Sequence, residues 1–408
     1  MQQQELIPHL FRTEYRKIVA VLCSLFGLQH IETAEDLVSD TFLSAAELWG
    51  QKGVPENPAA WLYTVAKNKT KNHLRRVANF DKKISKELSN EGVAEIELDL
   101  SEENINDSQL AMMFAVCDPS VAKEAQVALA LNLLCGFDAQ EIADAFLTNK
   151  DVVYKRIQRA KEKLRSENIS LAYPTVNEIS TRMDSVLSTI YLLFNEGYYS
   201  SSQNSVLRKD LCWEAMRLCY LLVSNDIANT TSANALLSLM CFHASRFEAR
   251  LNEHGELILY KDQDTSLWNE ELIVKGRYYL KIAFADGDLS KYHFEAAIAS
   301  WHTIKEDSPE KWATVLQLYD QLLQLEYSPM AAFNRIYVLS KVRGKQQAIE
   351  EAEQLNIVKN HFYYTLLGKL HEGIDDTLAL SYFKTALTLA ITDPEKKLIM
   401  AHMHELAE

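Results

Sequence analysis

Hydrophobic residues recur with the spacing of an α-helix along almost the whole chain. One helix is predicted over residues 5–26, and another over residues 32–49, where the polar side chains lie off one apolar stripe. This stripe consists of Leu37, Thr41, Phe42, Ala45 and Leu48. Glycine (12) and proline (8) are scarce, whereas a sheet-rich fold needs both for its tight turns. The pattern therefore predicts an all-α fold.

Three interruptions divide the chain. Residues 49–58 are predicted to form a loop because of their Gly and Pro content, and the helix that follows has a basic second half. Residues 81–107 are acidic and weakly periodic, which is typical of a linker. Pro174 marks a further boundary, after which helical periodicity continues to the end. We therefore expect domains at 1–80, 108–170 and 171–408, with a linker at 81–107.

The composition is that of an ordinary soluble protein, and 408 residues are enough for two or three domains. A formal net charge of -14 discourages non-specific binding to nucleic acid, so any such contact must come from a local patch. Neither a signal peptide nor an apolar run that could span a bilayer is evident, which predicts a cytoplasmic protein with no membrane contact. Six cysteines without CxxC spacing predict buried reduced thiols and no metal site; they are Cys23, Cys117, Cys135, Cys212, Cys219 and Cys241.

The most basic stretch is KDVVYKRIQRAKEKLR, residues 150–165. Before it, Asp138 and Glu141 predict a capping box at the start of a short helix, with Ala143 at the expected crossing point. A turn follows at 147–150, and Asp151 is predicted to cap a second helix. The second helix has a single apolar stripe of Val153, Ile157, Ala160 and Leu164.

Two helices around a tight turn, the second with a basic outer face, predict a DNA-binding helix-turn-helix. Leu147 stands where many such units have glycine, so this turn departs from the usual pattern. The alternative is that the basic face is only solvated. The candidate DNA-binding residues are Lys150, Tyr154, Lys155, Arg156, Gln158, Arg159 and Lys163.

Three motifs together resemble an extracytoplasmic-function (ECF) sigma factor of bacterial RNA polymerase. AEDLVSDTFLSAAELW resembles region 2.2, NPAAWLYTVAKNKTKNHLRR resembles regions 2.3 and 2.4, and FDAQEIADAFLTNKDVVYKRIQRAKEKLR resembles region 4.2. Further segments, such as YLLFNEGYYSS and LYDQLLQLEYSPMAAFNRIYVL, resemble the C-terminal extension of one ECF subgroup, which is similar to tetratricopeptide (TPR) repeats. The resemblance implies a region 2 bundle, an acidic linker, a region 4 helix-turn-helix and a TPR-like helical domain.

The resemblance implies three polymerase-binding residues, Asp36, Ser39 and Asp40, which would dock on the coiled coil of the β′ subunit; β is a further expected partner. Without the resemblance, the same acidic face is simply solvated. The implied DNA contacts of regions 2.3 and 2.4 are to the downstream (−10) promoter element. Their candidates are Trp61, Lys67, Asn68, Lys71, Asn72, Arg75 and Arg76.

Trp61 has two interpretations: its ring can stack on an unstacked base, or it can pack in the core beside Leu62 and Val65. The loop GQKGVPENP matches the family's specificity loop, although ordinary connectors share its composition. The resemblance also implies that the acidic linker threads through the polymerase, whereas the alternative is a flexible solubilising linker. Its carboxylates are Glu87, Glu91, Glu95, Glu97, Asp99, Glu102 and Glu103.

In the C-terminal half, Gly368 and the series Ala379, Phe383, Ala386 and Leu387 have nearly the spacing of a TPR helix pair, one residue short. A concentrated polar patch there predicts domain closure rather than a ligand pocket; it contains Arg246, Arg250, Asp262, Asp264 and Trp268. Motifs for catalysis, a cofactor or a metal are lacking, so no enzyme activity is expected.

The sequence thus predicts an ECF-type sigma factor that directs core RNA polymerase to specific promoter DNA and is regulated by its C-terminal domain, with a regulatory protein as a further partner of that domain. The alternative is a helix-turn-helix regulator with no polymerase role. A pure TPR scaffold would leave two separate basic helices in an acidic chain unexplained.

Overall fold

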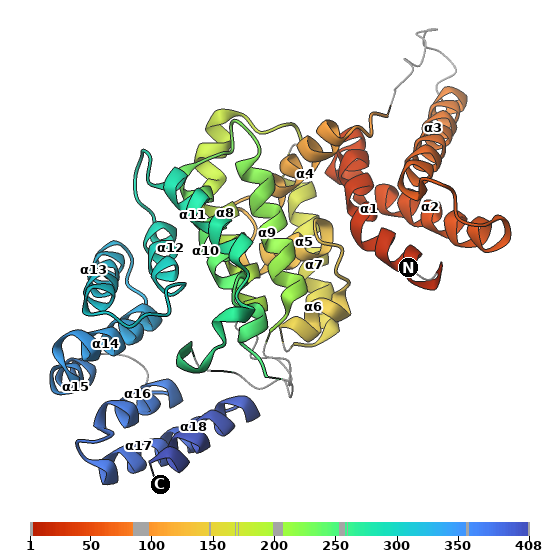
Figure 1. The fold of residues 1–408 in the computed structure, drawn as a ribbon. Coiled ribbons are helices and arrows are strands. Elements are labelled where there is room, and N and C mark those ends of the chain that lie inside the picture. Colours follow the sequence, from red (N-terminus) through yellow and green to blue (C-terminus); the bar gives the residue numbers. More distant parts are fainter. Residues whose placement is uncertain are drawn as a thin grey trace. The chain divides into compact units, whose positions relative to one another are not determined.

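The computed structural model describes residues 3–84, 98–146, 148–167, 169, 171–198, 207–252, 258, 260–355 and 359–406. Within these ranges every helix or strand element is a helix, so the predicted all-α fold is confirmed (Figure 1). The chain forms two compact units, Met1–Leu192 and Leu193–Glu408.

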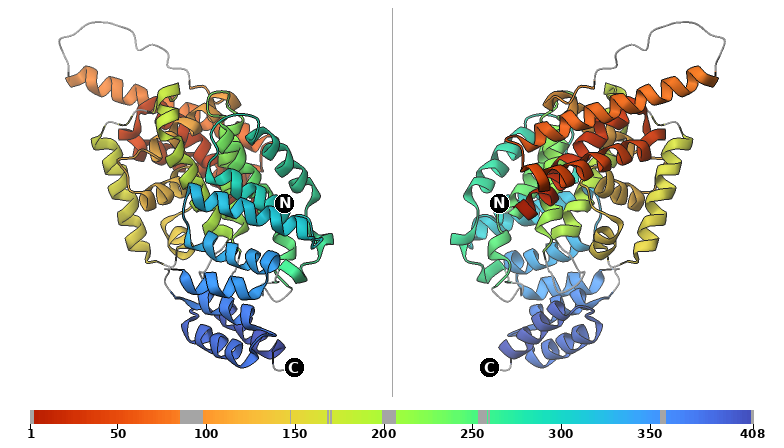
Figure 2. Two further views of the ribbon diagram at one scale, coloured as in Figure 1. Left: turned by 90° about the vertical axis from the view of Figure 1, so that its left-hand side faces the viewer. Right: turned by 90° about the vertical axis from the view of Figure 1, so that its right-hand side faces the viewer.

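The first unit begins with α1, which packs against α2 and α4 and supplies a continuous buried run from Ile18 to Cys23. The long helix α3 packs against α2, as both views of Figure 2 show in orange and red. The helices of this part are α1 (Gln3–Phe26), η1 (Leu28–His30), α2 (Ile31–Lys52) and α3 (Pro58–Ile84). The loop expected at 49–58 is therefore shorter, because α2 continues to Lys52 and ends where Gly53 takes a φ of 83°.

The rest of the first unit is also helical. Its helix α4 is buried on almost every side from Ser108 to Val116. Its helices are α4 (Glu102–Val116), α5 (Lys123–Leu133), α6 (Ala139–Ala145), α7 (Lys150–Ser166) and α8 (Val176–Tyr198). Both ends of the expected linker 81–107 are thus helical, because α3 runs to Ile84 and α4 starts at Glu102. The stretch between them, 85–97, lies outside the described residues.

The division between the units falls inside α8, later than the boundary expected at residue 170. The boundary lies there because hydrogen bonds and an ion pair join the first part of α8 to α5 and to the segment between α4 and α5. The side chain of Gln126 is 2% exposed, and its Oε1 accepts hydrogen bonds from Ser185 (2.9 Å) and Thr189 (3.3 Å). Arg182 pairs with Asp118 at 3.1 Å. Helical periodicity and Pro174 could not reveal these contacts.

The second unit is a series of helices in which neighbours in sequence pack together, drawn in green to blue in Figure 2. Two of its glycines let an aromatic ring approach a helix backbone closely: a Cβ on Gly276 would meet the Phe242 ring at 2.7 Å, and one on Gly368 would meet the Phe383 ring at 2.5 Å. The helices are α9 (Lys209–Val223), α10 (Thr231–Ala244), η2 (Phe247–Ala249), η3 (Tyr260–Asp262), η4 (Thr265–Leu267), α11 (Glu270–Ala283), α12 (Lys291–Trp301), α13 (Pro309–Leu325), α14 (Pro329–Arg343), α15 (Lys345–Gln354), α16 (His361–His371), α17 (Asp376–Leu389) and α18 (Asp393–Glu405).

All six cysteines are free and buried, as predicted. Burial raises the pKa of the Cys117 and Cys212 thiols to about 12, so both remain protonated at neutral pH. In the described part of the chain, no helix is both long enough and apolar enough to cross a membrane.

Candidate nucleic-acid interface

The predicted helix-turn-helix corresponds to α6 and α7. At the start of α6, Asp138 accepts hydrogen bonds from the backbone of Gln140 (2.7 Å) and Glu141 (2.8 Å), and the Glu141 side chain accepts one from the backbone of Asp138. The predicted capping box is therefore confirmed. The predicted cap of α7 is wrong: Asn149, two residues before Asp151, accepts the Asp151 backbone N–H at 2.7 Å.

The apolar face of α7 is buried as predicted, because Val153, Ile157, Ala160 and Leu164 all point into the unit. Most of the candidate DNA-binding side chains lie off this face. Lys150, Tyr154, Lys155, Arg159 and Lys163 are exposed, and Arg156 and Gln158 are half-buried. Exposed cations and a tyrosine on the outer face of a packed helix can reach phosphates and base edges without displacing any core residue.

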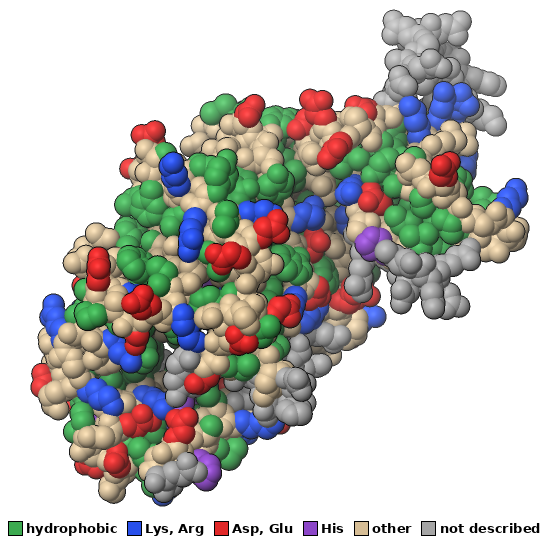
Figure 3. Space-filling view, in the orientation of Figure 1, with side chains coloured by type: hydrophobic (Ala, Val, Ile, Leu, Met, Phe, Trp, Pro, Cys, Tyr) green, Lys and Arg blue, Asp and Glu red, His purple; other side chains and the backbone are tan. Residues whose placement is uncertain are grey.

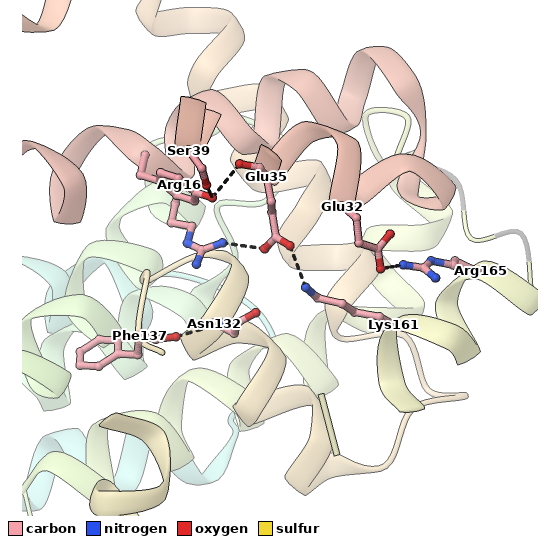
Figure 4. Close-up of polar contacts among 9 residues, drawn as sticks. Arg16, Glu32, Glu35, Ser39, Asn132, Phe137, Lys161 and Arg165 are labelled. Carbon is pink, nitrogen blue, oxygen red and sulfur yellow. Dashed lines mark hydrogen bonds and ion pairs between the residues drawn. The ribbon is translucent and has the colours of Figure 1, made fainter. Parts of the chain in front are cut away.

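Two other basic side chains of α7 point toward α2 (Figure 4). Lys161 is only 6% exposed, and its Nζ lies 3.1 Å from Oε2 of Glu35 on α2. The other oxygen of Glu35 accepts a hydrogen bond from Arg16 of α1 at 3.0 Å. One turn further along α7, Arg165 pairs with Glu32 of α2. No pattern in the sequence predicts this contact, although Lys161 follows Ile157 by four residues and so lies beside the apolar stripe.

On α2, the expected polymerase-binding residues lie next to this contact. Asp36 and Asp40 are exposed, while the Ser39 hydroxyl lies 2.9 Å from the hydroxyl of Tyr15, which also donates to the backbone oxygen of Glu35 at 3.0 Å. Burial is the main cause that raises the pKa of Tyr15 above its ordinary value. Two carboxylates of this face are therefore available to a basic partner, and Ser39 is held by a neighbour.

On α3, the structure brings the remaining candidates to one face. All six repeat at intervals of four and are exposed: Lys67, Asn68, Lys71, Asn72, Arg75 and Arg76. Blue side chains gather over the upper part of α3 in Figure 3. This arrangement provides two parallel rows of donors along the helix, a geometry suited to contacts with a phosphate backbone.

Trp61 at the start of α3 is half-buried. Its ring lies edge-on to that of buried Trp49, with centroids 5.3 Å apart and planes at 64°. One side of the Trp61 ring is therefore covered by packing against α2. Its neighbour Tyr63 donates a hydrogen bond of 2.5 Å to Glu14, which ties α3 to α1 as well.

The expected linker carboxylates are only partly described. Glu87, Glu91, Glu95 and Glu97 lie outside the described residues. Asp99 accepts hydrogen bonds from the backbone (2.8 Å) and side chain (3.1 Å) of Ser101, which caps α4. Glu102 and Glu103 lie in the first turn of α4, where carboxylates favour the positive end of the helix dipole.

The polar patch of the second unit packs around aromatic rings. The Arg250 guanidinium lies 3.9 Å from the Tyr198 ring centre, and that of Arg246 lies 5.6 Å from that of Tyr260. Trp268 is buried and stacks on Tyr260, while Asp264 caps η4 and Asp262 is exposed. Burial and the charges of Arg246 and Lys311 lower the pKa of His302 to about 3. Cation–π contacts in a buried cluster favour the structural interpretation.

Comparison with known proteins supports part of this picture. Residues 10–80 match sigma-70 region 2, and residues 182–284 match a family of unknown function (DUF6596). An uncharacterized protein of Rhizobium meliloti (strain 1021) is 29% identical over 390 residues, which cover 93% of this chain and 91% of that protein. No solved structure matches the chain. The region 2 match supports a sigma-factor role in transcription initiation, which implies binding to core RNA polymerase and promoter DNA.

Proposed function

We propose that this protein is an ECF-type sigma factor that binds core RNA polymerase and directs initiation at a specific class of promoters. The observation that carries the proposal is the coincidence of the sigma-70 region 2 match with α1–α3, followed in the same unit by a capped helix-turn-helix whose outer face is basic. A repressor would need the second feature alone. The pair fits a protein that contacts both polymerase and DNA.

Each surface has its own role in this proposal. Asp36 and Asp40 dock on the β′ coiled coil, because exposed carboxylates fit a basic partner. The two rows on α3 hold the downstream promoter element. The exposed face of α7 enters the major groove at the upstream (−35) element, with Lys155 and Arg159 as readers of base edges.

We also propose that the second unit regulates the sigma domains. It has its own hydrophobic core, and α16 and α17 pack through Gly368 and Phe383, as in the TPR-like arrangement that the sequence resembles. Stacked helix pairs present extended surfaces to protein partners.

The experiment is run-off transcription with core polymerase on a library of genomic fragments. We expect promoter-specific initiation only when this protein is added. The double variant Asp36→Arg with Asp40→Arg should lose initiation and co-purification with core enzyme, while Glu47→Arg, an exposed position on the same helix, should keep both. Promoter binding without any gain of initiation would instead favour a helix-turn-helix regulator without a polymerase role.

A further inference from the structure

The contact between α2 and α7 joins the two surfaces to which the proposed function assigns different tasks. Glu35 is shared between Arg16 and Lys161, and Glu32 pairs with Arg165 (Figure 4). The partners come from segments 126 and 133 residues apart in sequence. Because Lys161 is almost fully buried, this contact is part of the packing of the first unit and differs from an ion pair between exposed side chains.

The arrangement is incompatible with simultaneous use of both DNA surfaces. Promoter elements centred at −10 and −35 are about 25 base pairs apart, which is roughly 85 Å along B-DNA at about 3.4 Å per base pair. In the structure, α7 is bonded to α2, and α2 packs directly against α3. Helices held at side-chain distance cannot occupy both elements.

We propose that the α2–α7 contact is an intramolecular lock, in which the acidic surface of Glu32 and Glu35 binds the basic end of α7 and holds the sigma domains in a closed form that must open on the promoter. This inference rests on the proposed function. Opening separates Lys161 and Arg165 from α2 and frees Glu32 beside Asp36, while Glu35 keeps its pair with Arg16. The acidic surface of α2 thus loses the basic end of α7 and becomes available to the basic polymerase segment that is proposed to dock there.

The chemistry of the contact suits a reversible lock. A charge taken from water depends on its partner, so Lys161 favours the closed form only while Glu35 is ionised and near. In the open form, Lys161, Arg165 and Glu32 regain water, and Glu35 keeps Arg16 as its partner, which offsets part of the loss. The packing of α1 against α4 also contributes to the closed form, so the partner that opens it must replace apolar contacts as well.

The test measures a distance in the full chain. All six native cysteines are buried, so spin labels can be attached selectively to Ala46→Cys on α2 and Glu162→Cys on α7, both exposed and outside the contact. We expect one short distance for the otherwise unchanged protein. The variant Lys161→Gln with Arg165→Gln should add a longer population, while Lys123→Gln with Lys275→Gln, which removes the same charge at exposed positions, should not.

The same proteins are then mixed with core polymerase and promoter DNA. The short distance should disappear in all of them. At limiting polymerase, the lock variant should initiate at least about fivefold more often than the charge-matched control, because an exposed ion pair alone can contribute about this factor and the buried pair adds to it. The charge exchange Glu32→Arg with Arg165→Glu should restore the closed population that Arg165→Glu alone loses.

The possible failures can be told apart. An unchanged short distance in the lock variant, or a short distance that persists in the promoter complex, overturns the lock. Loss of initiation in every protein, including the unchanged one, contradicts the proposed sigma function. In that case a longer distance confined to the lock variant would still support a charge-dependent contact that holds α7 on α2.

Discussion

The two basic helices of the first unit use their charges differently. On α3, the basic side chains of Lys67, Lys71, Arg75 and Arg76 are all exposed along one face. On α7, some of the charge is exposed and some pairs with α2, through buried Lys161 and half-buried Arg165. The difference shows that the number of basic residues in a helix does not measure its nucleic-acid surface. Their position relative to the apolar stripe decides which of them can reach a partner.

The largest effect should come from breaking the inward pairs at their shared partner. Glu35→Ala would leave Arg16 and Lys161 buried without their common carboxylate, at a cost of about 3–5 kcal/mol. Hydrogen exchange of the α7 amides should accelerate accordingly. Asp36→Ala changes the next, exposed residue and should cost less than about 0.5 kcal/mol. Equal protection in both variants would show that the inward charges of α7 do not support the fold.

The next largest effect concerns the exposed face of α7. Arg159→Ala or Lys155→Ala should weaken binding to the cognate promoter by about 1–3 kcal/mol if the side chain reads a base. Binding to unrelated DNA should change much less. Competition titrations against scrambled upstream elements provide the measurement. An unchanged footprint at the upstream element in both variants would remove this face from the interface.

On α3, the expected loss is smaller and of another kind. Arg75→Ala with Arg76→Ala removes two exposed charges, which should reduce affinity similarly for all sequences and lower the slope of log K against log salt by about 1.8, or 0.9 per phosphate contact. The measurement is binding at several salt concentrations. A loss confined to one promoter sequence would mean that α3 reads bases here, which would weaken the contrast with α7.

Local patterns in the sequence predicted most of what is local in the structure. The all-helical class, the stripe of α7 and the capping box at Asp138 follow from spacing and residue type, and all are observed. The pairing of Lys161 with Glu35 spans 126 residues, so no local pattern contains it. The division inside α8 depends on contacts of the same kind: Gln126 binds α8 through side-chain hydrogen bonds, which helical periodicity does not record.

The smallest effect concerns the start of α7 and distinguishes two neighbouring polar residues. The sequence pattern predicts Asp151 as the cap, but the side chain that accepts a helix N–H is that of Asn149. Asn149→Ala should therefore cost about 1 kcal/mol, the usual loss for an N-cap. Asp151→Ala removes only a favourable charge in the first turn, at a cost of about 0.3–1 kcal/mol that declines with salt. Hydrogen exchange of the first α7 amides at low and high salt separates the two. Only the Asp151 effect should fade at high salt, because a cap hydrogen bond does not depend on a net charge. If the Asn149 effect fades and the Asp151 effect persists, the cap belongs to Asp151.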